Sequence, residues 1–532
     1  MKLINVFWGW LSAFREKHPR FTAWMSRYGI FLIILFFILL YSMISLLKHM
    51  NFQSHGWDLG IFDQHVWQLS HCEFGFNTVR MVPSLWGDHF HPIFFFVVPA
   101  YWIWSDARML LIYQAVVVAL GALPIYYVVR RNFKSSSCAL SMALTYLIFW
   151  GTMELIFFDF HTEAFLGPVL ALSYFFIDRD NWVGYLLTLP LLLWVKETTA
   201  LLVFFLGLYV IIFRRKWFVG SSTCIISLGW FFAVTKWIMP PLAAGADYFY
   251  FKYYSHLGDG WGEVIKYLIT HPHMAVKELF VPYHKAKLLL FILLPFLFLP
   301  LIGGFSIVAI PALLERLLSN YYPHWEILRH YNAIFAVIFI FALLDAIPRL
   351  YRWLGKRGRD IDYRKLVFAI CVLILLVNVP FTFARSAKTL FNPYFYMLDP
   401  QMEQMGYDII SMIPRDASVC AQDPVVPHMS QREHIYQFDG DTYGAEYVVL
   451  NKFLDCYPFT NRTLVWEIAK LYRDPRYVAH RFGYGWVVFT IKPEYDTDGT
   501  LQPFPTQESA LNNQYNPPTM RLKPSECGWV EC

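Results

Sequence analysis

Long apolar runs separated by short polar segments constrain this 532-residue chain more than any other feature of its sequence. A bilayer core of about 30 Å requires roughly 17–25 apolar residues in one helix. Such runs recur between Ile30 and Phe383, and 57% of all residues are hydrophobic while only 16% are charged. This composition excludes an ordinary soluble protein and predicts an α-helical polytopic membrane protein.

The apolar runs predict about 11 spanning helices. One further run, Ile93–Trp104, is too short to cross, and we expect it to lie in the interface as part of the first long loop. The predicted spans are Ile30–Leu47, Met109–Val129, Cys138–Leu155, Ala164–Ile177, Val183–Trp194, Ala200–Phe213, Phe218–Ile238, Lys287–Leu301, Phe305–Leu318, Tyr331–Ile347 and Val367–Phe383.

Basic residues set the expected orientation in the inner membrane. With the N-terminus in the cytoplasm, the pairs and runs at Arg130, Arg214 and Arg349 to Lys365 all lie inside, as the positive-inside rule requires. The loop Asn51 to Pro92 carries Arg80 as its only Lys or Arg and is expected outside. An odd number of spans then places the C-terminal region outside as well.

The predicted organisation has three parts. Residues 1–28 mix tryptophans with basic residues and read as a cytoplasmic interfacial amphipathic segment. Residues 29–386 form the transmembrane domain, with a first outer loop at 49–108 that holds interfacial helices. Residues 387–532 are polar, and we expect a soluble α/β domain without a Gly-rich phosphate loop. Its strands are predicted at Ala417–Ala421, Tyr447–Leu450 and Trp486–Ile491, with a helix at Thr463–Tyr472.

The C-terminal region also holds four of the eight cysteines of the chain. If this region faces an oxidising compartment, one or two disulfides are expected, and the sequence leaves their pairing open. These cysteines are Cys420, Cys456, Cys527 and Cys532.

Ionisable residues gather at the predicted outer ends of the spans. Such residues are costly at membrane level and usually mark a functional site. We therefore expect the clusters to share one site on the outer face. They are Asp58 and Asp63 in the first loop, Asp88-His89-Phe90-His91 before Pro92, Asp159-Phe160-His161-Thr162-Glu163, and Lys196-Glu197.

Each cluster allows a functional and a structural interpretation. Asp58 is our first candidate for a general base, but it would serve equally as a helix cap or a solvated loop acid. Asp159 and Glu163 share a face if they are helical, whereas an extended segment would align both with His161. An acid near a helix N-terminus is also favourable in any protein. Lys196 and Glu197 could simply pair with each other. Asp88 with His89 and His91 could bind a divalent metal ion, a sugar or a phosphate.

Further cations are predicted on the same side at Glu315-Arg316 and Arg329-His330-Tyr331. Arginine binds phosphate in a bidentate fashion that lysine cannot copy. A site that combines carboxylates with Lys196, Arg316 and Arg329 is suited to a reaction in which a phosphate leaves and a hydroxyl attacks.

This arrangement resembles the GT-C class of membrane glycosyltransferases. The stretch Gly87 to Arg131 is similar in layout to the lipid A aminoarabinose transferase and protein mannosyltransferase group. Asp88 matches the acid of that group's first motif, Asp159 matches an acid at the start of its fourth span, and Lys196 matches a lysine. His89 stands where the group carries a lysine, and Glu197-Thr198 where it carries Gly-Pro.

A closer resemblance is to an uncharacterised family of predicted membrane proteins within the same superfamily. It rests on Asp58-Leu59-Gly60-Ile61-Phe62-Asp63-Gln64, Gly87-Asp88-His89-Phe90, Asp159 to Glu163, His330-Tyr331 and Pro427 to Arg432. This resemblance covers nearly the whole chain. It implies a fold but does not indicate which substrate the protein uses.

The resemblance implies an inverting transferase that moves a sugar from a polyprenyl-phosphate donor to a glycan, lipid or protein acceptor on the outer face. Asp58, Asp88 and Asp159 would be catalytic. The donor and acceptor would be bound by Asp63, His89, His91, His161, Glu163, Lys196, Glu197, Arg316, Arg329 and His330.

No cofactor is certain from the sequence, and a divalent metal ion is one option. No basic patch with interleaved aromatic residues lies in a soluble region, which argues against nucleic acid as a partner. Two other functions stay open: a transporter or flippase of lipid or polysaccharide, with charges along a translocation path, and a non-catalytic receptor or scaffold. In a receptor or scaffold, the C-terminal domain with its segment Pro427 to Arg432 would be the binding module. The same segment could instead fold back over the membrane site as a lid.

Overall fold

The computed structural model describes residues 9, 13–14, 16–245, 249–359, 361–390 and 398–496. The chain forms two compact units. Unit 1 comprises Met1–Ser45, Trp86–Phe96 and Leu111–Phe391, and unit 2 comprises Leu46–Leu85, Val97–Leu110 and Asn392–Cys532. Most of the first long loop therefore groups with the C-terminal region, whereas the sequence suggested a division near residue 387.

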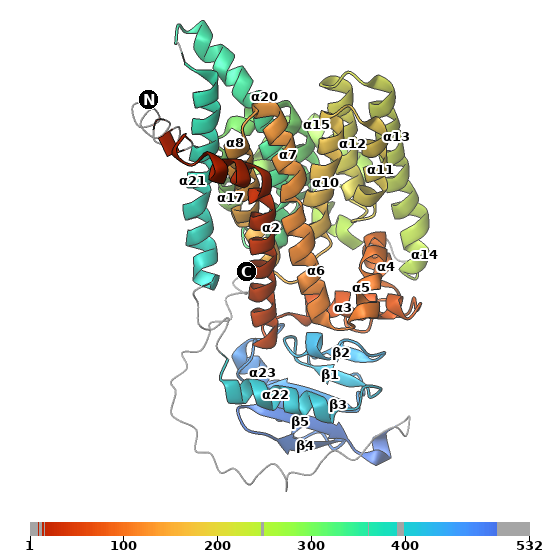
Figure 1. The fold of residues 1–532 in the computed structure, drawn as a ribbon. Coiled ribbons are helices and arrows are strands. Elements are labelled where there is room, and N and C mark those ends of the chain that lie inside the picture. Colours follow the sequence, from red (N-terminus) through yellow and green to blue (C-terminus); the bar gives the residue numbers. More distant parts are fainter. Residues whose placement is uncertain are drawn as a thin grey trace. The chain divides into compact units, whose positions relative to one another are not determined.

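Unit 1 is built of helices (Figure 1). Among the described residues, five helical stretches are long and apolar enough to cross a membrane, and two bent helix pairs bring the number to seven. The five are Pro19–Met50, Ala107–Phe133, Trp217–Leu242, His330–Lys356 and Tyr363–Phe383. The expected polytopic helical membrane protein is confirmed, while the number of about 11 spans stays a prediction.

Breaks explain why several predicted spans are not single long helices. The run Cys138–Leu155 becomes α8 (Ser136–Ile148) and α9 (Trp150–Phe157), which meet at an angle of 42°. The run Phe305–Leu318 begins as the 3-10 helix η7 (Gly304–Ala309) and continues as the short helix α18 (Ile310–Leu317). Helices α11 (Trp182–Leu193) and α12 (Thr199–Ile212) are apolar but short.

Most of the remaining helices of unit 1 overlap the predicted apolar runs, whereas α14, α15 and α16 lie in the segment after Ile238, where a long loop was expected. The boundary predicted between the interfacial segment and the transmembrane domain, at residue 28, lies within helix α2. These helices are α2 (Pro19–Met50), α6 (Ala107–Leu120), α7 (Ala122–Phe133), α10 (Glu163–Asp178), α13 (Trp217–Ala233), α14 (Met239–Leu242), α15 (Trp261–Thr270), α16 (Pro272–Phe280), α17 (Tyr283–Leu293), α20 (Ile334–Lys356) and α21 (Tyr363–Leu390).

Unit 2 contains a five-stranded sheet with the order β2-β1-β3-β5-β4. Strand β1 pairs in parallel with β2 and β3, whereas β5 pairs antiparallel with β3 and β4. The three predicted strands and the predicted helix are confirmed, and β2 and β4 were not foreseen. The elements are β1 (Val419–Ala421), β2 (Ile435–Gln437), β3 (Tyr447–Asn451), β4 (Tyr477–Arg481), β5 (Trp486–Ile491), α22 (Pro400–Met412) and α23 (Asn461–Leu471).

Alternating side chains of the central strands fill two separate cores. Val449 and Val488 pack with Ile409 of α22, whereas Val448 and Phe489 pack with Ile468 of α23. Successive side chains of a strand point to opposite faces, so α22 and α23 cover opposite faces of the sheet. The core that contains α22 also includes Phe52, Ile61, Val79 and Leu85 of the first long loop.

The first long loop is thus part of the fold of unit 2. It contains a π-helical turn η1 (Gly56–Gly60), helix α3 (Ile61–Ser70) and helix α5 (Val98–Ile103). Gly56 and Gly60 face Val426, and a Cβ atom at either glycine would lie 2.7 or 2.8 Å from a carbon atom of that valine. This close approach gives the two glycines of the Gly56-Trp57-Asp58-Leu59-Gly60 sequence a packing role.

The cysteines of the C-terminal region differ in state. Cys456 is disulfide-bonded, whereas Cys420 is a free buried thiol. Cys527 and Cys532 lie outside the described residues. At least one of the expected disulfides is therefore present.

Candidate functional site

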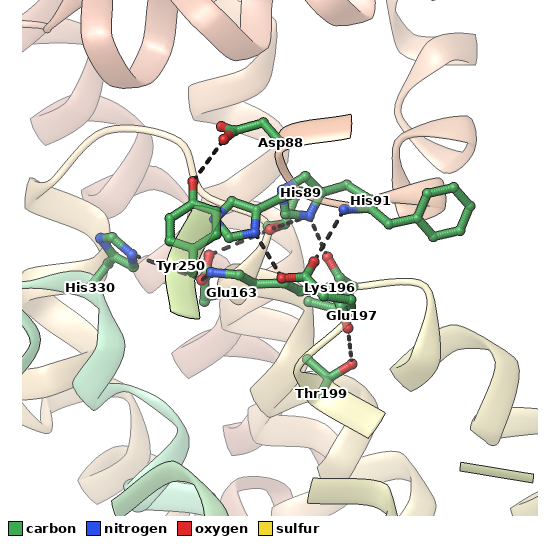
Figure 2. Close-up of polar contacts among 12 residues, drawn as sticks. Asp88, His89, His91, Glu163, Lys196, Glu197, Thr199, Tyr250 and His330 are labelled. Carbon is green, nitrogen blue, oxygen red and sulfur yellow. Dashed lines mark hydrogen bonds and ion pairs between the residues drawn. The ribbon is translucent and has the colours of Figure 1, made fainter. Parts of the chain in front are cut away.

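Two segments of unit 1, more than 100 positions apart in the sequence, are joined by hydrogen bonds (Figure 2). The ring of His89 contacts one carboxylate oxygen of Glu197 at 2.9 Å, and the backbone N–H of Phe90 donates to the other at 3.1 Å. His91 Nδ1 lies 2.7 Å from the carbonyl oxygen of Val195, to which it donates. The backbone N–H of Ile93 donates to the carbonyl of Trp194. The Asp-His-Phe-His motif and the Lys-Glu pair therefore form one structure.

The turn that carries Lys196 and Glu197 is closed by its own residues. Helix α11 ends at Leu193, three residues after Pro190, and α12 begins at Thr199. The Thr199 hydroxyl donates to the carbonyl oxygens of Leu192, at the end of α11, and of Lys196, in the turn, both at 2.6 Å. This turn fixes the backbone positions from which the side chains of Lys196 and Glu197 extend.

Gly87 brings the other segment close to α14. A Cβ atom at Gly87 would lie 2.5 Å from the backbone carbon of Leu242 and 2.6 Å from the backbone nitrogen of Ala243. Backbone atoms cannot give way as a flexible side chain would, so only glycine fits at this position. The close packing at Gly87 thereby fixes the backbone position of the neighbouring Asp88 and His89.

Lys196 is largely buried and is surrounded by carboxylates. Its Nζ atom lies 3.7 Å from Glu163 Oε1 and 6.0 Å from the ring centre of Tyr250. Burial alone lowers the pKa of Lys196, but the charges of Glu163, Glu197 and Glu315 outweigh burial and raise it. Lys196 is therefore a permanent cation, and it forms its ion pair with Glu163 rather than with its neighbour Glu197.

The charges of Glu197 and His91 are also set by their surroundings. Burial favours the protonated acid at Glu197, yet His89 and Lys196 lower its pKa below the usual range. Burial and the nearby His89 lower the pKa of His91 to about 4. At neutral pH His91 is thus an uncharged ring that donates to the carbonyl of Val195, while Glu197 is a carboxylate.

Glu163 connects a second group of residues to Lys196. It lies in the first turn of α10, where the helix dipole favours an acid, as predicted. His330 Nε2 lies 3.9 Å from Glu163 Oε1, and the rings of His330 and His161 stack with centres 3.7 Å apart. The Thr162 hydroxyl contacts His91 Nδ1 at 3.3 Å. Contacts of neighbouring side chains therefore link the cluster around Glu197 to the cluster around His330.

Tyr250 adds an aromatic surface that the sequence motifs did not reveal. It belongs to the 3-10 helix η4 (Phe249–Leu257), its ring stacks on His89 with centres 4.0 Å apart, and its hydroxyl donates to Asp88 Oδ1 at 3.1 Å. In the same helix, the hydroxyl of Tyr254 donates to the backbone carbonyl of Glu315. Neither a motif nor a helical spacing marks these tyrosines, although the segment is unusually rich in aromatic residues.

Asp159 occupies a buried turn between α9 and α10. Its φ angle of +87° is unusual for a residue with a side chain, so it does not share a helix face with Glu163. Gln114 holds the turn, because its side-chain amide donates to the Asp159 carbonyl and accepts from the backbone N–H of His161. Backbone in this region is costly and is often found at functional sites.

The two predicted arginines differ in their contacts. Arg316 is buried, and its guanidinium donates to the carbonyls of His324 and Glu326 and to the side chain of Asn332. These contacts favour a structural role. Arg329 donates to the Glu326 carboxylate at 2.9 Å and keeps a partly exposed side chain.

Asp58 and Asp63 belong to unit 2, whereas the other predicted site residues belong to unit 1. Asp58 lies in the π-helical turn η1. Asp63 is fully buried, and its carboxylate accepts hydrogen bonds from Tyr101, Ser430 and Gln431. A shared cavity for Asp58, Asp88, Asp159 and Lys196 stays a prediction.

The contacts of unit 1 thus bring together most of the predicted residues of that unit. No group of three or more His, Cys, Asp or Glu side chains within the described part of the chain is arranged to hold a metal ion. The arrangement instead offers one cation, carboxylates that accept hydrogen bonds, and an aromatic ring. The linked residues are Asp88, His89, His91, His161, Glu163, Lys196, Glu197 and His330.

A solved structure has a fold similar to that of this chain. The crystal structure of ArnT from Cupriavidus metallidurans bound to undecaprenyl phosphate is 12% identical, with a TM-score of 0.50 over 88% of this chain and 99% of that one. The apo structure of the same protein is also 12% identical, with a TM-score of 0.47 over 86% and 98%. No curated protein matches the sequence.

The described helices and this comparison define an α-helical membrane protein with a fold similar to that of ArnT and a small C-terminal sheet domain. The membrane-protein class and the fold that the sequence motifs led us to expect are thereby confirmed. The chain belongs to the DUF2079 family of predicted membrane proteins, whose family model matches residues 48–458.

Proposed function

We propose that this protein is a glycosyltransferase that moves a sugar from a polyprenyl-phosphate donor to an acceptor on the outer face of the membrane, with inversion at the anomeric carbon. The observation that carries the proposal is the buried Lys196, held among Glu163, Glu197 and Glu315 at the ends of apolar helices. The GT-C-like fold supports it, since ArnT is bound to undecaprenyl phosphate in its crystal structure.

The chemistry requires a fixed positive charge where the phosphate leaves. A preformed cation in a water-poor site stabilises a departing phosphate without reorganisation, which is usually the largest contribution to catalysis. Lys196 fits this role because its ammonium is permanent and its ion pair with Glu163 is long, at 3.7 Å. Arg329 is the second candidate, whereas the three protein contacts of Arg316 support a role in holding the loop before α20.

The carboxylates and the aromatic ring suit the sugar. Sugar hydroxyls donate to carboxylates and stack their C–H face on aromatic rings, and Asp88, Glu197 and Tyr250 supply both kinds of group. Asp58, Asp88 and Asp159 remain the proposed catalytic residues, with Asp58 as the first candidate for the general base. The sugar and the acceptor are left open by these contacts.

The test is transfer from a panel of undecaprenyl-phosphate-linked hexoses by the purified protein in nanodiscs, with a membrane-envelope extract as acceptor. Wild-type protein should release undecaprenyl phosphate and label the extract. Lys196→Ala should lower kcat/KM by roughly 10²–10³-fold, as the loss of one preorganised charge does. Lys266→Ala, at an exposed lysine of α15, is the matched control and should retain full activity.

Two results would overturn the proposal. Wild-type protein that moves the intact lipid-linked sugar across a vesicle membrane but transfers nothing would be a flippase. Wild-type transfer that is unchanged in Lys196→Ala would remove the cluster around Lys196 from the reaction.

A further inference from the structure

Helix α15, in the segment where the sequence suggested a long loop, is apolar on two sides. Val264 is buried and packs with Tyr254 and Leu257 of η4. Ile265 and Ile269 remain outside that contact and are 58% and 73% exposed. Residues four apart lie on one face of a helix, so the two isoleucines form an apolar stripe on the outside of unit 1.

Helix α16 repeats this pattern. Leu279 packs against the same small core around Tyr254, and every residue of α16 is at least partly exposed. Val276 and Phe280, again four positions apart, are 56% and 48% exposed. A helix that is apolar on its inner and its outer side is typical of an element that contacts lipid as well as protein.

Helix α16 leads into an apolar helix. Together with the stretch Tyr283–Phe296 it is long and apolar enough to cross a membrane, but the two parts meet at an angle of 71°. Lys285 holds this bend, because its Nζ atom donates to the Glu278 carbonyl at 3.0 Å and lies 3.7 Å from Glu278 Oε2. His256 Nε2 of η4 lies 3.7 Å from the same Oε2 atom. The bend is therefore fixed by contacts of α16 with both η4 and α17.

Aromatic residues surround the bend. Tyr283, the first residue of α17, and Tyr322 of α19 (Tyr322–Trp325) are both exposed. The ring of His284 contacts both, with centres 4.0 Å from Tyr283 and 5.7 Å from Tyr322. Tyrosine is enriched where membrane-spanning segments meet the headgroup region. The exposed tyrosines thus favour a bilayer interface at the level of the bend.

We propose that α15 and α16 lie in the interface of the bilayer and that their outer stripe inserts among phospholipids. The outer stripe consists of Ile265, Ile269, Val276 and Phe280. Phospholipid is the occupant that fits, because the stripe continues into an apolar helix and is flanked by exposed tyrosines at the bend. An interfacial helix buries its apolar face about 5–10 Å into the boundary between headgroups and acyl chains. This role does not depend on the proposed transferase activity.

Depth-dependent fluorescence quenching of the full-length protein in phosphatidylcholine nanodiscs tests this placement. Ile269→Cys and Val276→Cys, each in the Cys72→Ser background, carry an environment-sensitive NBD label. Cys72→Ser removes the exposed free thiol of the described residues, and the emission of this parent after the same labelling is subtracted. Thr270→Cys and Lys277→Cys are the matched controls, since each lies one residue further and about 100° around the helix.

Both stripe labels should lose most of their emission to lipid with a doxyl group near the glycerol backbone. A doxyl group near the end of the acyl chain, or iodide in the buffer, should quench them far less. The two control labels should be quenched mainly by iodide. Ile265→Cys and Phe280→Cys are the second pair, used if a first variant does not elute as a monodisperse protein.

Three results would overturn the proposal. Iodide quenching of the stripe labels that equals that of the controls would place α15 and α16 in water. Strongest quenching by the deep doxyl group would make α16 part of the membrane span itself. Stripe labels that neither iodide nor doxyl lipid reaches would be covered by protein. Each of these results would leave the transferase proposal to its own test, because the labels report depth and not activity.

Discussion

The carboxyl group of Asp63 is fully buried and accepts three hydrogen bonds inside unit 2. Burial raises its pKa to about 6, although the bonds from Ser430, Tyr101 and Gln431 lower it in part. The folded protein therefore holds a proton on Asp63 at a pH where the unfolded chain has lost it. A residue that the sequence placed in the substrate site thus acts on the stability of unit 2.

This raised pKa predicts a stability that depends on pH. The contribution of Asp63 is fully present below about pH 4 and is lost as the pH rises through about 6, because the unfolded state then binds fewer protons than the folded state. The change is at most about 3 kcal/mol for a shift of this size. Asp63→Asn cannot ionise, so its melting temperature should vary less between pH 4 and 7 than that of the wild-type protein. Parallel curves for the two proteins would contradict the assignment.

At the scale of elements, the contact between the turn η1 and the 3-10 helix η10 (Val426–His428) determines where the first long loop lies in unit 2. A Cβ atom at Gly60 would meet only Val426 Cγ1 at 2.8 Å, and its next neighbour is 3.8 Å away. A Cβ atom at Gly56 would meet Val426 Cβ itself at 2.7 Å. The two glycines therefore face different atoms of the same side chain.

This difference predicts a selective rescue. Gly60→Ala and Gly56→Ala should each destabilise the protein by about 1–3 kcal/mol through overpacking. Adding Val426→Ala removes Cγ1 but keeps Cβ, so it should relieve Gly60→Ala and leave most of the cost of Gly56→Ala. Thermal unfolding of the three single variants, Val426→Ala included, and the two double variants measures the coupling energies. If Val426→Ala rescued Gly56→Ala and Gly60→Ala equally, the two glycines would not pack against Val426 in the way described above.

At the scale of the whole molecule, the basic residues predict that the first long loop is outside and the loop before α21 is inside. Cys72 offers a natural probe, since it is the one exposed thiol among the free cysteines of the described residues. A membrane-impermeant maleimide should label wild-type protein in intact cells and should label Cys72→Ser less. Lys356→Cys, placed in the Cys72→Ser background, should gain label only after the membrane is permeabilised. Labelling of residue 356 in intact cells would reverse the orientation.

The sequence predicted most of the elements because their signals are local. A run of apolar residues such as Tyr331–Ile347 predicts a helix in any fold, and the buried run Trp486–Ile491 predicts a strand. Helix ends and breaks were less predictable, since the bend after Ile148 and the 3-10 start of Gly304–Ala309 depend on packing between helices. The sequence left a helical and an extended conformation open at Asp159, and the residue lies in a turn at positive φ that Gln114 stabilises.

The sequence by itself determined the class of this protein, because the free energy of burying apolar side chains in lipid adds up residue by residue along the chain. It also singled out most of the polar residues that the contacts of unit 1 link together, since charges within apolar stretches are costly unless they are paired. Only the tertiary structure decided the pairing: Glu197 with His89, Lys196 with Glu163, and Asp423 with His55. These contacts join atoms 2.6 to 3.7 Å apart, and no periodicity in the sequence records which distant segments the fold brings within that range.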